Sequence, residues 1–434
     1  MKISVIGLGK LGLPLVASIA SKGFFTYGVD IDKDVVKNLN KGLTHLKEPN
    51  LQNLIKKFKK NIVALEDIKK ATLNSEITFI ITPTPSKKTG YFSTIFVEKA
   101  AKEIAKSLKE KNKYHLIVLV STVMPGATDK IKKIIEKQSG KVCGLDFGLC
   151  YNPEFIALGS VIFNLLNPDF VLIGESDQKA GSILEKFYKR FCSNNPKVIR
   201  MNFVNAELTK ISVNTFVTTK ISYANMLSEI CEKLPGGNVD EVTAALGLDS
   251  RIGLKYLKGG AAFGGPCFPR DNVAFISLAK KLNTFYKLSE ATHQTNLHQI
   301  NRLANKIFKL IKPGKTVGIL GLSYKPYTDV TDESVGLLLS ILLLSKNISL
   351  ILHDPLALEN TKKVLKDKPK YTFDLKICIQ EADLLVVATN WPEYQAIKPS
   401  WFNNKPKIII DPWRILSNVN FKKNITYLPL GINF

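Results

Sequence analysis

The chain has 434 residues, of which 45% are hydrophobic and 23% charged, proportions that exclude a disordered or fibrous chain. At about 100–200 residues per domain, this length predicts two to four domains. The longest apolar run, near residues 335–344, is too short to span a bilayer, and the glycine-interrupted N-terminus is unlike a secretion signal. Six cysteines at irregular spacing, with no Cys-x-x-Cys pair, favour a reducing cytoplasm and no metal site.

The charge is strongly basic: 61 Lys and Arg against 37 Asp and Glu give a net charge of +24. A nucleic-acid binder is one interpretation; a lysine-rich composition set by an AT-rich genome is the other. The basic residues are spread over all segments, without a basic tail or an aromatic-interleaved patch. We therefore expect an anionic small substrate and no nucleic-acid partner, and we note that Arg251, Arg270 and Arg414, three of only six arginines, lie within motifs.

The N-terminal segment has the pattern of a dinucleotide-binding unit. Residues 2–6 form an apolar, β-branched run typical of a buried strand, and Gly-Leu-Gly-Lys-Leu-Gly follows at 7–12. A helix is predicted over 14–22, and a second strand over 25–29 ends at Asp30. This order of strand, glycine loop, helix, strand and acid is typical of the opening βαβ of a Rossmann fold.

Each residue of this pattern has an expected role. Gly7 allows a tight turn, Gly9 lets the backbone approach a pyrophosphate, and Gly12 lets the helix pack on the strand, with free N–H groups at the helix N-terminus for the phosphates. Asp30 would accept hydrogen bonds from ribose hydroxyls and repel a 2′-phosphate, which favours NAD over NADP. Asp32 could share this role.

The remaining elements predict an α/β protein in three regions. Further strands are expected at 77–81 and 116–120, each followed by a Pro or Gly turn. Residues 204–234 lack Gly and Pro and predict one long helix, which Pro235-Gly236-Gly237 ends. The third region alternates predicted strands at 316–320, 348–352, 384–388 and 408–410 with an apolar helix near 334–344.

The first and third regions repeat each other. The matching pairs are 3–7 with 317–321, Val29-Asp30 with His353-Asp354, and 79–82 with 386–389. We therefore predict two Rossmann-like parallel-sheet domains, 1–203 and 301–434, joined by a central helical domain, 204–300, that contains the long helix.

Two further motifs carry candidate chemistry. The run 263–271, Phe-Gly-Gly-Pro-Cys-Phe-Pro-Arg-Asp, surrounds Cys267 with glycines that let a ligand come close and makes it a candidate nucleophile rather than an inert core thiol. In 205–214, Lys210 and Asn214 are four residues apart and project from one helix face, which by itself is typical of a solvated surface.

Taken together, these segments resemble the UDP-glucose/GDP-mannose dehydrogenase family over essentially the whole chain. Single motifs are weak, but their order and spacing are specific. The matching segments are 7–13, 82–85, 121–126, 152–155, 206–214, 251–253, 264–271, 321–325 and 411–414.

The resemblance implies an NAD-dependent oxidoreductase that converts the C6 hydroxyl of a nucleotide sugar into a carboxylate, through a thiohemiacetal and a thioester on Cys267. Lys210 would stabilise the oxyanion, Asp271 and Thr122 would hold a water, and Glu154 would act as base for thioester hydrolysis. Asn214 completes the implied catalytic set.

The resemblance also implies the binding residues. The cofactor would contact Gly7, Gly9, Lys10, Leu11, Gly12, Asp30, Thr82, Pro83, Thr84, Ser121 and Thr122. The sugar nucleotide would contact Glu154, Phe155, Lys210, Asn214, Arg251, Lys258, Phe263, Gly264, Tyr324, Lys325 and, from the third domain, Arg414. Arg251 would reach a neighbouring subunit's substrate, so at least a homodimer is implied, formed through the central domain.

The sequence departs from the family pattern in four places. Leu158 stands where many members have an acid, Asp332 where an arginine helps to hold the cofactor, and Pro266 where serine is usual. The segment 167–170 lacks a basic residue often found there. These departures bear on cofactor affinity and on the sugar, and they leave the cysteine chemistry intact.

The Cys-Phe-Pro-basic-Asp run favours UDP-glucose as substrate and UDP-glucuronate as product, a polysaccharide precursor made in the cytoplasm. Oxidation of GDP-mannose or a UDP-N-acetylhexosamine is the alternative. A nucleotide-sugar-binding homologue with weakened catalysis and a two-electron hydroxy-acid dehydrogenase also stay open, although the latter would need neither Cys267 nor a second nucleotide-binding domain. No metal and no membrane association are expected.

Overall fold

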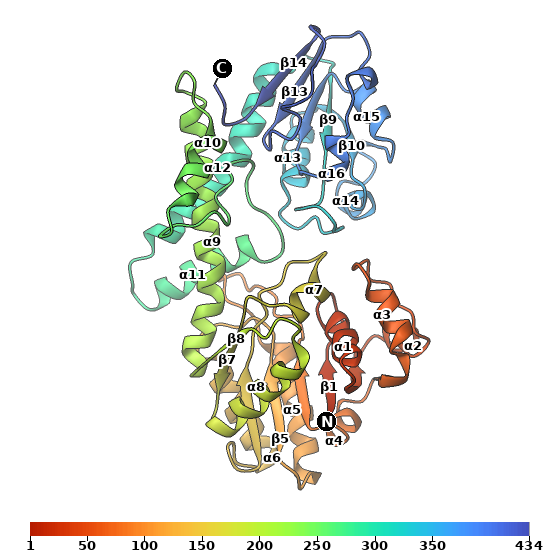
Figure 1. The fold of residues 1–434 in the computed structure, drawn as a ribbon, viewed down its shortest axis with the longest axis vertical. Helices are drawn as coiled ribbons and strands as arrows, with labels where there is room; N and C mark the ends of the chain where they lie inside the picture. Colours follow the sequence, from red (N-terminus) through yellow and green to blue (C-terminus); the bar gives the residue numbers. More distant parts are fainter. Residues whose placement is uncertain (434) are drawn as a thin grey trace. The chain divides into compact units, whose positions relative to one another are not determined.

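The structure, a computed structural model, describes residues 1–433 of the chain. It consists of two compact units, here called unit 1 (Met1–Ser212) and unit 2 (from Val213 onward), each with its own sheet (Figure 1). Both sheets are Rossmann-like, which confirms the predicted α/β class.

Unit 1 is built around an eight-stranded sheet of order β3-β2-β1-β4-β5-β6-β7-β8. All neighbouring strands are parallel except β6 and β7, which pair antiparallel. The strands are β1 (Lys2–Ile6), β2 (Phe25–Val29), β3 (Ile62–Leu65), β4 (Ile77–Ile80), β5 (His115–Leu119), β6 (Phe147–Tyr151), β7 (Phe170–Glu175) and β8 (Lys197–Met201). Its helices are α1 (Gly12–Ser21), α2 (Lys33–Asn40), α3 (Leu51–Lys57), α4 (Ile68–Leu73), α5 (Ile95–Glu110), α6 (Ala127–Ser139), α7 (Val161–Leu166), α8 (Gln178–Phe191) and the start of α9 (Phe203–Cys231).

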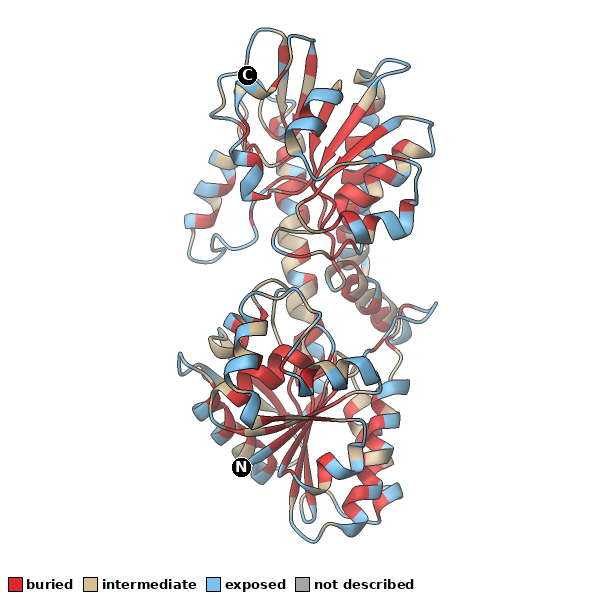
Figure 2. Ribbon diagram, turned by 90° about the vertical axis from the view of Figure 1, so that its right-hand side faces the viewer, coloured by how far each residue is buried: buried red, intermediate tan, exposed pale blue. Residues whose placement is uncertain are grey.

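The central strands of unit 1 are mostly apolar and almost wholly buried because helices cover both faces of the sheet (Figure 2). All five residues of β5 are buried, including His115, which hydrogen-bonds the hydroxyl of Thr78. The strand order reverses between β1 and β4, so the loops after these two strands diverge at the carboxyl edge of the sheet. Such a point is where open α/β sheets bind their ligands.

Unit 2 combines the rest of α9 with α10 (Val239–Leu248), α11 (Phe268–Lys281), α12 (Lys287–Leu310) and a parallel six-stranded sheet of order β11-β10-β9-β12-β13-β14. The strands are β9 (Thr316–Leu320), β10 (Ser349–His353), β11 (Lys370–Tyr371), β12 (Leu384–Val387), β13 (Lys407–Asp411) and β14 (Ile425–Pro429). The helices around the sheet are α13 (Val335–Leu344), α14 (Leu358–Leu365), α15 (Leu375–Glu381) and α16 (Pro392–Gln395).

The internal repeat predicted from the sequence is present in the backbone. Gly7 and Gly321 end the first strand of their sheets with φ of 99° and 98°, a conformation that favours glycine. A Cβ on Gly12 would lie 1.8 Å from the Gly7 carbonyl oxygen, and one on Gly336 would lie 2.0 Å from that of Gly321. Both helices therefore approach their strand as closely as only glycine permits.

The long helix α9 is continuous, as predicted, and runs from unit 1 into unit 2. It begins one residue before the predicted start and ends three residues before the predicted end. The helical segment after Ser212 belongs to the same compact unit as the C-terminal sheet. The three-domain division at 1–203, 204–300 and 301–434 stays a prediction.

Candidate active site

The glycine loop after β1 has the geometry expected of a dinucleotide-binding turn. A Cβ on Gly7 would lie 2.8 Å from the carbonyl oxygen of Ile81, and the Gly7 N–H donates to the carbonyl of Val29 at 2.8 Å. A Cβ on Gly9 would meet no protein atom within 4 Å, and Gly9 is exposed together with its neighbour Lys10. The loop is thus tight where the chain must turn and open at the position where a pyrophosphate would approach.

Asp30 fits the role of ribose acceptor. Its half-buried carboxylate accepts from the Leu8 N–H at 2.7 Å and from the Asp32 N–H at 3.0 Å, which fixes its orientation and leaves acceptor sites on both oxygens. Asp32 instead caps α2, since its Oδ1 accepts from the N–H groups of Asp34 and Val35. Asp30 is therefore the better candidate of the two.

The other predicted cofactor residues lie in two loops that are pinned together. The Ser121 hydroxyl donates to the Thr82 carbonyl at 2.7 Å, and the Thr84 hydroxyl donates to the Thr122 carbonyl at 2.8 Å. These loops follow the neighbouring strands β4 and β5. The structure thus brings Thr82, Pro83, Thr84, Ser121 and Thr122 to one edge of the sheet.

We expect NAD to support turnover better than NADP at equal concentration, because Asp30 would repel a 2′-phosphate. Asp30→Asn keeps an acceptor for the Leu8 N–H but removes the charge, so the NAD/NADP preference should fall by about tenfold, roughly 1.4 kcal/mol. Initial rates with both cofactors measure this. A wild-type preference for NADP would contradict the role given to Asp30.

Two of the catalytic residues predicted in unit 1, Glu154 and Lys210, meet at the carboxyl end of β6. Glu154 lies three residues after this strand, and the Tyr188 hydroxyl of α8 bonds Asn152 Oδ1 at 2.5 Å and lies 3.3 Å from Glu154 Oε1. Lys210 of α9 is 7% exposed and donates from Nζ to the backbone carbonyl of Glu154 at 2.6 Å. Its Nζ also lies 4.6 Å from the ring centroid of Phe155.

This environment moves the pKa of the Glu154 carboxyl toward neutral pH. Burial raises the pKa of its carboxyl to about 7, against the lowering effects of the Tyr188 hydrogen bond and the Lys210 charge. A general base is most effective when its pKa lies near the working pH. Glu154 is therefore suited to take a proton from water at neutral pH.

Two residues that support Glu154 and Lys210 were given no role from the sequence. Tyr188 has no recognisable motif around it. Glu207, one turn before Lys210, is fully buried and accepts from the N–H groups of Gly126 and Thr128 at 2.6 and 2.7 Å and from the Thr128 hydroxyl at 2.6 Å. Glu207 thereby fastens α9 to the N-terminal turn of α6 and orients the helix face that carries Lys210.

The thiol predicted as nucleophile lies in unit 2. Cys267 is exposed and occupies the N-cap position of α11, where its carbonyl accepts from the Asp271 N–H at 2.8 Å. A helix N-terminus favours negative charge, and thiolates at such positions are the reactive form of cysteine. The other five cysteines are buried or half-buried.

Asp271 lies one turn below the thiol and is 1% exposed. Asn214 of α9 donates from Nδ2 to Asp271 Oδ2 at 2.6 Å, and Arg270 Nε lies 3.5 Å from Oδ1. The structure therefore brings together Asn214, Asp271 and Cys267, three of the residues predicted to act in catalysis. That Asp271 holds a water stays a prediction.

The glycine-rich run before Cys267 packs against the loop after β9. The Gly265 N–H donates to the Asp332 carbonyl at 2.9 Å, and a Cβ on Gly264 would lie 2.2 Å from the Glu333 carbonyl oxygen. A Cβ on Gly265 would lie 2.5 Å from the ring of Tyr324. Four residues predicted to bind the sugar nucleotide thus lie along two adjoining loops: Phe263, Gly264, Tyr324 and Lys325.

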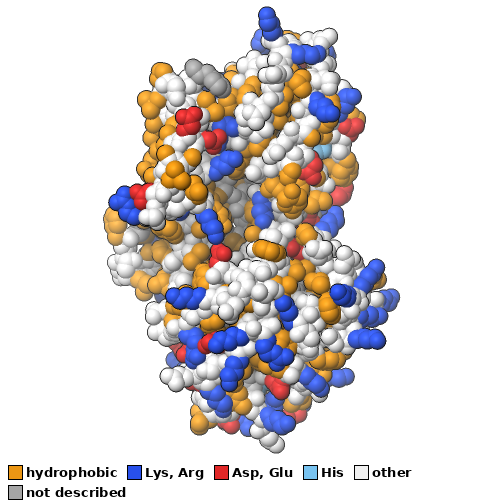
Figure 3. All heavy atoms as spheres, viewed as in Figure 1, with side chains coloured by type: hydrophobic (Ala, Val, Ile, Leu, Met, Phe, Trp, Pro, Cys, Tyr) orange, Lys and Arg blue, Asp and Glu red, His pale blue; other side chains and the backbone are white. Residues whose placement is uncertain are grey.

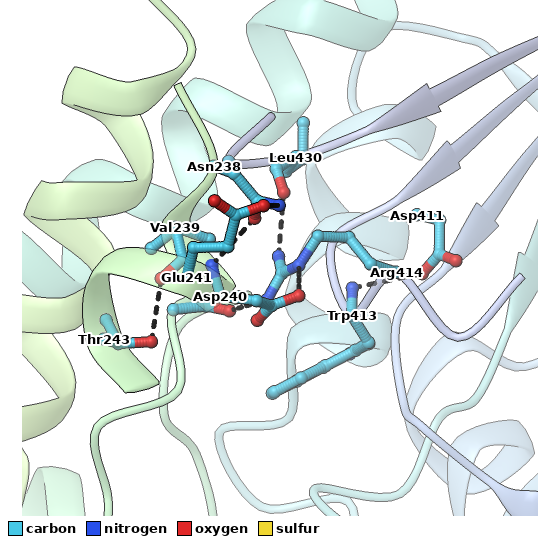
Figure 4. Close-up of polar contacts among 12 residues, drawn as sticks. Asn238, Val239, Asp240, Glu241, Thr243, Asp411, Trp413, Arg414 and Leu430 are labelled. Carbon is cyan, nitrogen blue, oxygen red and sulfur yellow. Dashed lines mark hydrogen bonds and ion pairs between the residues drawn. The ribbon is translucent and has the colours of Figure 1, made fainter. Parts of the chain in front are cut away.

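The Arg414 side chain bonds other groups of the protein (Figure 4), and its contact with the sugar nucleotide stays a prediction. Its side chain is 2% exposed and makes a two-pronged ion pair with Asp240 of α10, at 2.7 and 2.8 Å. The remaining donors bond the carbonyls of Pro412, Leu430 and Gly259. All five guanidinium N–H groups are used, so the predicted substrate contact would require breaking one of these bonds.

Arg251 and Lys258, the other basic residues predicted to bind substrate, are exposed. The Arg251 side chain is 86% exposed and pairs with Asp249. That Arg251 acts on a neighbouring subunit's substrate stays a prediction.

The acid that repeats Asp30 in the second sheet has a different environment. Asp354 is fully buried, and its Oδ2 accepts from the N–H groups of Leu322 and Ser323, from the Ser323 hydroxyl and from Trp391 Nε1. Its Oδ1 accepts from the N–H groups of two residues that follow it, Leu356 and Ala357. Asp354 therefore organises its own loop.

Among residues 1–433, no cluster of three or more His, Cys, Asp or Glu side chains could hold a metal ion, and no helix is long and apolar enough to cross a membrane. Lys and Arg side chains are scattered over both units on the face shown in Figure 3.

Comparison with known proteins places these observations in one family. Residues 1–192, 204–298 and 318–418 match, in order, the NAD binding, central and UDP binding domains of the UDP-glucose/GDP-mannose dehydrogenase family. The chain is 33% identical to the UDP-glucose 6-dehydrogenase TuaD of Bacillus subtilis over 92% of its own length and 85% of that protein. It is also 33% identical to the UDP-glucose 6-dehydrogenase AglM of Haloferax volcanii, over 96% and 97% of the two chains.

Solved structures agree with this result. A UDP-glucose dehydrogenase from Pyrobaculum islandicum superposes with a TM-score of 0.89 at 31% identity, covering 98% of this chain and 96% of the other. A UDP-D-ManNAc dehydrogenase from Pyrococcus horikoshii superposes with a TM-score of 0.83 at 26% identity, covering 99% of each chain.

Proposed function

Because the chain belongs to the UDP-glucose/GDP-mannose dehydrogenase family and is an NAD-dependent oxidoreductase, we propose that it oxidises UDP-glucose to UDP-glucuronate. The observation that carries the proposal is the exposed Cys267 at the N-terminus of α11, at the end of a glycine-rich loop packed against the UDP-binding domain. Two relatives that match nearly the whole chain bear the name UDP-glucose 6-dehydrogenase.

The proposed chemistry removes four electrons from C6 of the sugar. The glycine loop and Asp30 would hold NAD, which would supply a hydride acceptor for each of the two oxidations. The alcohol loses a hydride and a proton to give an aldehyde, and the Cys267 thiolate adds to the aldehyde carbon to give a thiohemiacetal. Loss of a second hydride and a proton gives a thioester, and water cleaves its C–S bond, which releases the carboxylate and the thiol.

The protein groups around these steps have distinct proposed roles. The ammonium group of Lys210 stabilises the oxyanion formed when the thiolate adds. Glu154, whose pKa is raised to about 7 by burial, takes a proton from the hydrolytic water. Asp271, to which Asn214 donates at 2.6 Å, holds the hydrolytic water together with Thr122.

One observation favours an alternative sugar in the substrate. The Pyrococcus horikoshii UDP-D-ManNAc dehydrogenase has the same fold over the whole chain, so a UDP-N-acetylhexosamine is the second candidate. A homologue with weakened catalysis has less support, since Cys267, Lys210 and Asp271 are all present.

NADH release from a panel of UDP- and GDP-sugars tests the proposal. With UDP-glucose, two NADH should form per sugar acid. Two NADH from a UDP-N-acetylhexosamine alone would move the substrate to the second candidate, and one NADH per sugar, or none, would overturn the four-electron reaction.

We further propose that the protein is a homodimer formed through α9. In the part of α9 that belongs to unit 2, and just beyond its end, large apolar side chains are exposed at helical spacing: Phe216, Tyr223, Met226, Ile230 and Leu234. Phe216 is 68% exposed. An apolar stripe of this kind marks a protein–protein interface, which a second copy of the helix would cover.

In such a dimer, we expect Arg251 to complete the partner's site. Light scattering at micromolar concentration should give at least a dimer, and Arg251→Ala should lose activity. Co-expression of Arg251→Ala with Cys267→Ala chains should restore roughly a quarter of the wild-type activity, because each mixed dimer has one site with both residues intact. A fully active monomer would contradict the interface.

The reaction belongs in a reducing cytoplasm, where the Cys267 thiol stays reduced. The sugar acid would supply polysaccharide synthesis.

A further inference from the structure

The loop that ends at Cys267 is held between the helices of unit 2 and its sheet. At 259–265, glycines lie against other chain segments so closely that a Cβ would collide with them. The distances from such a Cβ are 2.7 Å to the Ala224 carbonyl oxygen for Gly259, 2.9 Å to Trp413 for Gly260 and 2.2 Å to the Glu333 carbonyl oxygen for Gly264. The loop is therefore closely packed against the rest of unit 2. Because the packing excludes water, its backbone N–H and C=O groups need hydrogen-bond partners within the protein.

Asn225 supplies partners at the start of the loop. This residue of α9 is 1% exposed. Its Oδ1 accepts from the Gly260 N–H at 2.8 Å, and its Nδ2 donates to the Ala261 carbonyl at 3.0 Å. One carboxamide thus satisfies a donor and an acceptor of consecutive loop residues.

Asn296 supplies hydrogen-bond partners to the backbone of Phe263, which lies four residues before Cys267. It lies on α12 and is 7% exposed. Its Oδ1 accepts from the Phe263 N–H at 2.8 Å, and its Nδ2 donates to the Phe263 carbonyl at 2.9 Å. The side chain pairs with both backbone groups of one residue, as a neighbouring β-strand would.

From these contacts we propose that Asn225 and Asn296 are positioning residues that hold the Cys267 loop at the location from which the thiol reaches the sugar aldehyde. The inference rests on the proposed function only for what the thiol does. A carboxamide suits the task because it offers a donor and an acceptor in one plane and carries no charge at any working pH. Arg414 adds a third anchor at Gly259.

The bonds matter because Cys267 itself is exposed, so its location depends on the loop that leads to it. Replacing either asparagine by an apolar residue leaves a buried N–H and C=O without their partners, and the loop must move to find others. A displacement of about 1 Å between reacting groups lowers a rate by about a hundredfold.

The test compares Asn225→Leu, Asn296→Leu and Asn296→Asp with a matched control. The control is Asn424→Ala, since Asn424 also donates to loop carbonyls, those of Asn403 and Lys405, but lies outside the thiol loop. For each variant, the kcat, the KM for UDP-glucose, the NADH formed per sugar acid, the melting temperature and the rate of Cys267 alkylation by iodoacetamide are measured.

We expect both leucine variants to lose kcat by about tenfold to a hundredfold with KM nearly unchanged, and to release aldehyde, so that more than two NADH form per acid. Asn296→Asp is the sharper case: a protonated aspartate restores both bonds to Phe263, whereas the ionised form loses the donor. Its kcat relative to wild type should rise as the pH falls. The control should match wild type.

A merely structural role for the two asparagines would lower the melting temperature and leave the kcat of the folded variants unchanged, and that result would overturn the inference. If wild type oxidises no nucleotide sugar, the proposed function fails while the inference is still tested, because a displaced loop changes the alkylation rate of Cys267. Equal alkylation rates in wild type and both leucine variants would then overturn it.

Discussion

Replacing Cys267 with alanine is expected to lower the rate of sugar-acid formation by several orders of magnitude, because covalent catalysis is lost. The alcohol can still lose its first hydride, but the aldehyde has no second hydride to give until a nucleophile adds to its carbonyl. Binding of the sugar nucleotide and of NAD should stay within about tenfold, roughly 1.4 kcal/mol, since the thiol contributes little to either. Isothermal titration and product analysis measure both effects.

The control for this substitution is Cys231→Ala at the end of α9, a buried thiol outside the site that should cost only modest stability. Cys267→Ser should trap a stalled adduct that mass spectrometry detects, because water cleaves an ester less readily than a thioester. A Cys267→Ala enzyme that made sugar acid at the wild-type rate would show that the cysteine is structural and that the mechanism is wrong.

Glu154→Gln is expected to slow thioester hydrolysis by about a hundredfold to ten-thousandfold, the usual range for loss of a general base. Because burial raises the pKa of Glu154 to about 7, the wild-type hydrolysis rate should fall as the pH falls through 7 and the base becomes protonated. In Glu154→Gln, the hydrolysis rate should not show this acidic limb of the pH–rate profile. A pre-formed thioester followed by mass spectrometry between pH 5.5 and 8.5 isolates the step.

The contribution of Glu154 to folding stability should have the opposite pH dependence and fall as the pH rises. A carboxyl with a raised pKa in the folded state stabilises the fold only while it is protonated, and this contribution is lost as the pH rises through about 7. Glu154→Gln should therefore melt no lower than wild type at pH 8. The matched control is Glu185→Gln on α8, whose carboxylate pairs with Lys189 and Arg200. An unchanged acidic limb in Glu154→Gln would remove Glu154 from the mechanism.

Patterns within a few consecutive residues were enough to predict some of the helices and strands. The strand at 2–6, the glycine turn and the strand that ends at Asp30 follow from short-range spacing, and α9 follows from a long stretch without Gly or Pro. The strands β3, β6, β7, β8, β11 and β14 were not predicted. Strand β6 has the sequence Phe-Gly-Leu-Cys-Tyr, which contains no β-branched residue, and it is buried because it pairs with β5 inside the sheet.

Contacts between distant residues account for what the sequence could not show in the site. Tyr188 lies 34 residues from Glu154, and the two asparagines lie 33 to 36 residues from their partners in the thiol loop. The motif around Arg414 suggested a ligand, but its ion-pair partner, Asp240, lies 174 residues away in the sequence. Spacing along the chain carries no information about such pairs.

The carboxylate of Asp354 is fully hydrogen-bonded within the protein, and this affects how many dinucleotide sites the duplicated motif implies. Gly321 and Asp354 repeat Gly7 and Asp30 in backbone geometry, so a motif count alone would assign the chain two dinucleotide pockets. In the second copy, the acid that would recognise a ribose is enclosed by its own loop and by Trp391. The chain thus carries one architecture twice, but only Asp30 of the first copy keeps acceptor sites for a ribose, and we expect one NAD to bind per chain.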